Sequence, residues 1–113
     1  MNIEDLTFDE RGLVPVIAQD AANGEVLMLA WANREALERT VAEGRMVYWS
    51  RSRQELWRKG DTSGNVQHWE ELHADCDADV VLAKVHQEGP ACHTGARSCF
   101  FERLGAEDPG AAG

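Results

Sequence analysis

Apolar runs along this chain are short, about the length of strands, and one longer segment has apolar residues at helical spacing. Two of the runs, Leu13–Gln19 and Glu25–Trp31, flank a segment that ends in Asn-Gly, which is a strong signal for a β-hairpin. Pro15 favours an edge position for the first strand, because proline cannot donate a backbone hydrogen bond to a neighbouring strand.

The longer segment predicts a helix over residues 34–43. Asn33 is a suitable N-cap, Leu37 and Val41 lie one turn apart, and Gly44 is typical of the residue that follows a helix. Further strands are predicted over residues 46–50, 66–74, 80–87 and 99–104. Several strands with a single principal helix favour a compact α+β fold with a mainly antiparallel β-sheet.

The length of 113 residues corresponds to one domain, which we expect over residues 13–104. Residues 1–12 would form an N-terminal extension, and the small residues of 105–113 would form a flexible tail. The acidic N-terminus lacks the apolar stretch of a secretory signal, and no apolar run could span a membrane, so we expect a cytoplasmic protein.

Charge limits the partners that this chain could bind. The formal net charge of −9 argues against nucleic acid and against an anionic membrane surface. An anionic ligand would therefore need a local basic cluster or a metal ion.

Three aspartates alternate along the segment DCDAD, at Asp75, Asp77 and Asp79. On an extended backbone their side chains would share one face and form an oxygen-rich site suited to Mg²⁺, while Cys76 would point to the other face. An EF-hand loop is excluded, because its required glycine would be Val80. A solvated acidic turn is the alternative interpretation.

The chain has three cysteines, Cys76, Cys92 and Cys99, and an odd number without an export signal is poor evidence for disulfides. Cys92 and Cys99 lie in the segment GPACHTGARSC, whose glycines and proline indicate a loop. Three thiolates would leave one position of a tetrahedral zinc ion open for water, as catalytic zinc requires. Buried structural thiols remain an alternative, as does a nucleophilic pair of Cys92 with His93.

His93 follows Cys92 directly in the sequence. It could close the zinc site, but adjacent side chains rarely both reach one small ion. We therefore expect His93 to support the site or to transfer protons.

The segment Ser50–Gln67 contrasts with the acidic remainder of the chain. Between Arg51 and Lys59 there are four cations and one anion, a local charge of +3. Serine and threonine hydroxyls and two glycines accompany these cations, which is a composition typical of phosphate binding. The order of residues is not that of a Walker A loop, and a solvated loop is the alternative.

These motifs together resemble the phosphoribosyl-AMP cyclohydrolases, the enzymes of the third step of histidine biosynthesis. The matching stretches are Tyr48–Gln67, Asp75–Asp79 and Val85–Phe101, and the weaker match of GLVPVIAQD and VLMLAWAN extends the resemblance across nearly the whole chain. One departure is Asp61, where the family pattern has glutamate.

The resemblance implies hydrolysis of the N1–C6 bond of the adenine ring in phosphoribosyl-AMP, which gives the ring-opened formimino carboxamide ribotide. It implies one zinc ion per subunit, held by Cys92 and Cys99 of one chain and Cys76 of the partner, in an intertwined homodimer with shared zinc sites. It also implies that the three aspartates hold magnesium. Zinc would lower the pKa of a water molecule and so supply the nucleophile.

The reaction also needs proton transfer and phosphate binding. His93 is the first candidate for proton transfer and His73 the second. The small nucleotide substrate carries two phosphates, and the candidates to bind it are Arg51, Arg53, Lys59, Thr62 and Ser63, with magnesium.

Two other functions fit part of the pattern. A small zinc-stabilised binding module without catalysis would use the cysteines but not the open zinc position. A zinc nucleotide deaminase would use similar chemistry on a purine, but its H-x-E…P-C-x-x-C signature is missing.

Overall fold

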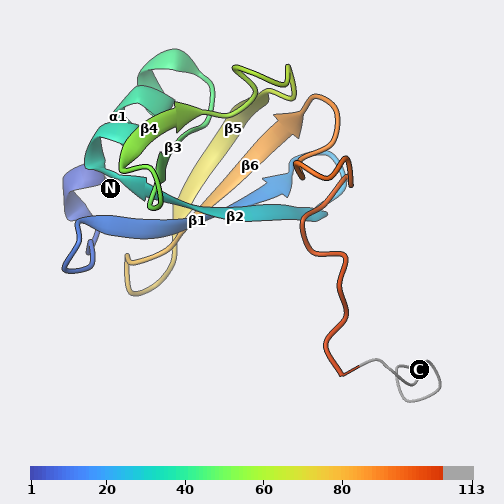
Figure 1. Ribbon diagram of the computed structural model, residues 1–113. Helices are drawn as coiled ribbons and strands as arrows, with labels where there is room; N and C mark the ends of the chain where they lie inside the picture. Colours follow the sequence, from blue (N-terminus) through green and yellow to red (C-terminus); the bar gives the residue numbers. More distant parts are fainter. Residues whose placement is uncertain (106–113) are drawn as a thin grey trace.

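The computed structural model describes residues 1–105, which form a curled mixed β-sheet with one α-helix packed against it (Figure 1). The elements in chain order are η1 (Ile3–Asp5), β1 (Leu13–Asp20), β2 (Val26–Asn33), α1 (Arg34–Glu43), β3 (Val47–Ser50), β4 (Glu55–Arg58), β5 (Gln67–Ala74) and β6 (Val81–Gln87). The α+β class with one principal helix is confirmed.

The sheet order is β4-β3-β2-β1-β6-β5. Its pairings are antiparallel except that of β1 with β6, which is parallel. The residues just before β3 also reach β5, since Met46 N donates to Gln67 O at 3.0 Å and Trp69 N donates to Gly44 O at 3.2 Å. The sheet therefore curls until its β3 and β5 regions meet.

β1 and β2 form the expected hairpin, closed by Asp20 N donating to Glu25 O at 2.7 Å. The prediction of an edge position for β1 is wrong, because β1 lies between β2 and β6. Pro15 is tolerated there because pairing with β6 begins only at Val16, so no bond to β6 is lost at the proline.

The helix prediction is confirmed at both ends. Asn33 Oδ1 accepts from Ala36 N at 2.8 Å, and Gly44 adopts the left-handed conformation after the last turn. Ala36, Leu37 and Thr40 are buried, and the indole of Trp69 on β5 donates to Thr40 O at 2.6 Å. The helix thus covers one face of the sheet and joins β2 and β3 to β5.

Two features differ from the sequence prediction. β4 lies inside the basic segment, where no strand was predicted. Residues 99–104 form no strand, and most of the predicted tail, residues 106–113, lies outside the described residues. Ile3, Leu6 and Phe8 of the N-terminal segment pack against the core. None of the helices within residues 1–105 is long and apolar enough to cross a membrane.

Candidate active site

The cysteines lie in two separate segments, the β5–β6 turn and the loop after β6, and these segments adjoin opposite ends of β6 (Figure 1). Cys76 lies in the turn from β5 to β6, whereas Cys92 and Cys99 lie in the loop that follows β6. β6 has seven residues, so the two regions are roughly 20 Å apart along the strand. One chain therefore brings Cys92 and Cys99 together but does not bring Cys76 to them.

Cys92 and Cys99 are free and lie beside each other in what we call the cysteine loop, residues 89–99. The Thr94 hydroxyl donates to Cys92 Sγ at 3.1 Å and lowers the pKa of that thiol, with a smaller contribution from the Cys99 thiol. Burial raises the pKa of Cys99, and the neighbouring Cys92 adds to that increase. The two thiols therefore interact directly with each other.

Lys59 lies next to both sulfurs. Its ammonium group donates to Ala91 O at 2.6 Å. Burial lowers the pKa of Lys59, while the charges of Cys99 and Cys92 oppose that decrease. Because an ammonium group has three donors, Lys59 can hold the cysteine loop and still contact a ligand.

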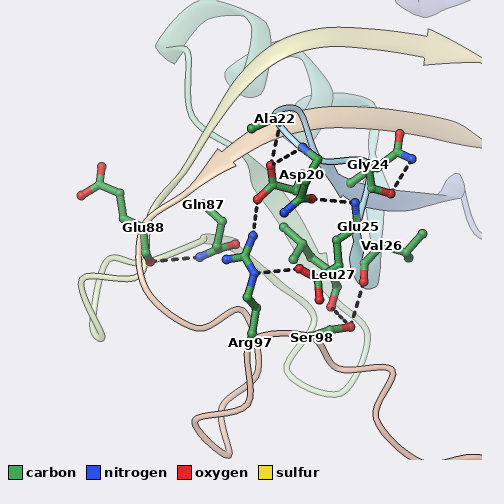
Figure 2. A network of polar contacts seen from close by, with 12 residues as sticks. Asp20, Ala22, Gly24, Glu25, Val26, Leu27, Gln87, Glu88, Arg97 and Ser98 are labelled. Carbon is green, nitrogen blue, oxygen red and sulfur yellow. Dashed lines mark hydrogen bonds and ion pairs between the residues drawn. The ribbon is translucent and has the colours of Figure 1, made fainter.

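The end of the cysteine loop is fastened to the β1–β2 hairpin (Figure 2). Arg97 forms ion pairs with Asp20 and with Glu25, the latter at 2.7 Å. Ser98 Oγ donates to Val26 O at 2.8 Å, and Cys99 N donates to Leu27 O at 2.7 Å. The position of Cys99 is thus set by the hairpin.

Asp75, Asp77 and Asp79 also converge, with carboxylate oxygens within 4.8 Å of one another. The extended backbone expected for this segment is wrong, since residues 75–79 form a turn with Ala78 in the left-handed conformation. Asp75 accepts from the backbone of Asp79 at 3.0 Å, which lowers the pKa of Asp75. Desolvation by the neighbouring groups raises the pKa of the exposed Asp79, and the charges of Asp75 and Asp77 add to the increase. A divalent cation would relieve this repulsion.

A cavity of about 700 Å³ opens between the basic segment and the cysteine loop. His93 lies on its lining with four of the five substrate-binding candidates, namely Arg53, Lys59, Thr62 and Ser63. The fifth, Arg51, is not part of this cavity, because its guanidinium stacks on Trp31 at 4.6 Å from the ring centroid and lines a different hollow. Within one chain, Arg51 is therefore apart from the other candidates.

The departure from the family pattern at Asp61 leaves a carboxylate that binds two arginines. Asp61 Oδ1 accepts from Arg58 Nε at 2.8 Å and from Arg45 Nη2 at 3.2 Å. Arg58 also pairs with Glu43 at 2.9 Å. Arg58 is thereby neutralised by two acids, so the positive charge that the segment presents to the cavity comes mainly from Lys59 and from Arg53, whose exposed pair with Glu55 is long at 3.9 Å.

The second proton-transfer candidate lies in another part of the chain. His73 is on β5, where its ring bonds Glu71 at 2.8 Å. It lines an apolar hollow formed with η1 and α1, close to the turn that carries Cys76. His93 and His73 are therefore separated in the same way as the cysteines.

The cysteines that one chain brings together are too few to form a complete zinc site by themselves. Cys92 and Cys99 provide two soft sulfur ligands, which suit zinc, and a third thiolate has to come from elsewhere. Cys76 is exposed on its turn and accessible to a second molecule.

The sequence did not reveal the ion pairs that Arg97 forms with Asp20 and Glu25. Arg97 was visible as the one arginine between two candidate metal ligands, but its partners lie 77 and 72 positions away in sequence. Asp20 begins the short segment that ends in Asn-Gly, and this segment predicts only a turn.

Comparison with known proteins agrees with the resemblance. A family model described as phosphoribosyl-AMP cyclohydrolase matches residues 28–101. A protein of that name from Bordetella petrii is 66% identical over 101 residues, covering 88% of this chain and 75% of the relative. Others from Cereibacter sphaeroides and Thiobacillus denitrificans are 62% and 59% identical, covering 88% and 97% of this chain and 83% and 84% of the relatives. The chain therefore belongs to the phosphoribosyl-AMP cyclohydrolase family.

Proposed function

We propose that this chain is a hydrolase of histidine biosynthesis that opens the adenine ring of phosphoribosyl-AMP at the N1–C6 bond. Family membership supports the reaction class. The observation that carries the proposal is the cavity in which His93 and Lys59 lie beside the Cys92–Cys99 pair. The cavity contains groups for proton transfer and anion binding, and the cysteines that could bind metal lie next to it in the same loop as His93.

The complete site would need two copies of the chain. Cys76 is roughly the length of β6 away from the other two cysteines, too far for one metal ion. In a two-fold dimer, the 75–79 turn of each copy would approach the cysteine loop of the other. The same arrangement would bring the partner's His73 and its three aspartates towards the cavity that contains His93.

Exposed apolar side chains support association with a second copy. Phe100 and Phe101 are 62% and 56% exposed on a segment that leaves the sheet (Figure 1). Val26 and Leu29 on β2 are also exposed. Exposed apolar side chains of this kind are typical of an interface, and a segment that leaves the sheet fits the intertwined homodimer that we propose.

The residues would divide the chemistry between them. Zinc, held by Cys92, Cys99 and the partner's Cys76, would supply an activated water as nucleophile. Water adds at C6, the N1–C6 bond breaks, and N1 receives a proton, which His93 is placed to deliver. Lys59 and Arg53 would bind phosphate, with Thr62 and Ser63 as hydroxyl donors. Magnesium at Asp75, Asp77 and Asp79 would neutralise the remaining phosphate charge.

The test combines elemental analysis with a ring-opening assay before and after chelation. We expect one zinc ion per chain, a change in absorbance as phosphoribosyl-AMP is converted, and loss of conversion when a chelator removes the metal. Fully zinc-loaded protein that leaves the substrate unchanged would indicate a binding module instead. Release of ammonia would indicate a deaminase, because ring opening releases none.

A further inference from the structure

We propose that Arg97 and Asp20 form a positioning pair that holds Cys92 and Cys99 in the geometry required for zinc. This inference rests on the proposed zinc site. It adds to that site two residues that bind neither metal nor substrate but determine how well the metal is bound.

The acceptor side of the pair is rigid. The Asp20 side chain is only 11% exposed, at the end of the central strand β1. Its Oδ1 accepts from Ala22 N at 2.7 Å and from Asn23 N at 3.3 Å, while its Oδ2 accepts from Arg97. These bonds fix the carboxylate before Arg97 binds to it, so the pair loses little freedom on forming.

Arg97 reaches two acids from two different atoms (Figure 2). Its Nη2 contacts Asp20, and its Nε donates to Glu25 at 2.7 Å. A planar guanidinium held in this way can neither rotate nor translate freely. Because two carboxylates already satisfy its charge, Arg97 is poorly suited to bind phosphate, and a positioning role fits it better.

The fixed position of Arg97 is transmitted to both cysteines. On one side Ser98 and Cys99 follow directly, with Cys99 N bonded to Leu27 O at 2.7 Å. On the other side Ala91 N donates to Arg97 O at 3.0 Å, and Cys92 N donates to Ala96 O at 3.1 Å. The two arms of the cysteine loop therefore pair through Arg97 and its neighbour, and displacement of Arg97 would move both sulfurs.

The first test is zinc affinity, measured by competition with a chromophoric chelator on the assembled protein. We expect Asp20→Asn and Arg97→Ala each to weaken zinc binding by about tenfold to a hundredfold, the range found when groups that orient ligands are removed. Arg97→Lys keeps the charge but loses the planar fork, so it should fall between Arg97→Ala and the native protein. Glu35→Gln is the control, since it removes an exposed ion pair with Arg39 on α1 and should leave zinc affinity unchanged.

The second test is the absorption spectrum of the cobalt-substituted protein, which reports the number of thiolates and their geometry. A positioning role predicts altered thiolate-to-cobalt bands in Asp20→Asn under conditions where its circular dichroism still shows a folded protein. At saturating zinc, kcat should recover largely. Circular dichroism also separates this role from general destabilisation, which would lower the folded fraction without changing the bands of the folded part.

The outcomes distinguish this inference from the function on which it rests. Native protein that shows no thiolate-to-cobalt bands would overturn the zinc site itself. Native protein that shows them, with affinities and spectra unchanged in Asp20→Asn and Arg97→Ala, would overturn the positioning role and leave the zinc site standing.

Discussion

The 75–79 turn and the cysteine loop both carry candidate metal ligands, but they are stabilised in different ways. The turn is exposed, and its own backbone closes it, with Ala78 N donating to Asp75 O at 3.0 Å. The cysteine loop is tied to distant parts of the chain, by Lys59 from the basic segment and by Arg97 to the β1–β2 hairpin.

This difference suits the two regions to different roles in the proposed metal sites. The cysteine loop already holds its two sulfurs together, so a zinc ion bound there, as proposed above, would need a further ligand from elsewhere. The turn concentrates three carboxylates that repel one another, so a cation would stabilise it. We infer that each copy contributes an ordered half-site and an exposed turn that completes the half-site of its partner.

The largest expected effect comes from removing a cysteine sulfur at either end of β6. Cys92→Ser or Cys99→Ser should lose zinc and activity together, and Cys76→Ser should do the same although it lies at the far end of β6. Elemental analysis and the ring-opening assay measure both losses.

Mixing two inactive variants makes this prediction specific for a shared site. An equimolar mixture of Cys76→Ser and Cys92→Ser, unfolded and refolded together, should regain about a quarter of native activity, because half of the dimers would contain one intact site of two. The control is Cys92→Ser mixed with Cys99→Ser, whose mutations fall on the same half-site, so no intact site can form. Equal recovery in both mixtures, or none in either, would contradict sharing of the site.

His93→Ala should have the next largest effect, because His93 lies in the cavity beside Cys92 but is not needed to hold zinc. We expect kcat to fall by about 10²- to 10⁴-fold with zinc still bound, the usual contribution of a general acid or base. His68→Ala is a suitable control, because the His68 ring pairs with Glu88 and does not line the cavity that contains His93. Unchanged turnover in His93→Ala would move the proton-transfer role to another group, and His73→Ala would then be measured.

Asp77→Asn should affect the turn without affecting the cysteine loop. Removing one of three carboxylates should raise the magnesium concentration for half-maximal activity by about tenfold, equivalent to about 1.4 kcal/mol of cation binding. Zinc content should stay unchanged, because the cysteine ligands are intact. An unchanged magnesium requirement would count against the aspartate site, and loss of zinc would show that the two regions are coupled.

Local patterns in the sequence predicted the elements whose signals are local. The helix over 34–43 was predicted at the correct residues because Asn33 and Gly44 mark its two ends. The short strand β4 was missed because Glu55–Arg58 is half polar and pairs only with β3. The central position of β1 could not be predicted either, because it depends on parallel pairing with a strand more than 60 residues later.

The candidate site shows the same limit. The ligand types were visible in the sequence, since DCDAD and GPACHTGARSC carry their chemistry in short segments. Their separation along β6 was not visible, because it depends on the length and direction of a strand. The contacts of Arg97 with Asp20 and Glu25 were hidden for the same reason, since they join segments that are distant in sequence.

The last expected effect is on the stability of the fold, not on metal binding or turnover, and it sharpens the contrast between the fastened cysteine loop and the exposed turn. Hydrogen bonds from Ala22 N and from Arg97, together with the charge of Arg97, hold the pKa of Asp20 below its ordinary value of 3.8, although burial opposes this decrease. A carboxyl group whose pKa is depressed in the folded protein contributes stability that is fully present above the unfolded value. That contribution is lost as the pH falls through the lower folded value.

Urea unfolding of the native protein and of Asp20→Asn at a series of pH values measures this contribution. The native protein should be more stable by about 1.5–3 kcal/mol near neutral pH, the usual value of a hydrogen bond to a charged group, and the difference should shrink as the pH falls below 3.8. Glu38→Gln, in an exposed pair with Arg34, should differ from the native protein by less than about 1 kcal/mol. A difference that is independent of pH would mean that Asp20 holds the hairpin by shape instead of charge, and the cysteine loop would then be fastened mainly by Ser98 and the backbone of Cys99.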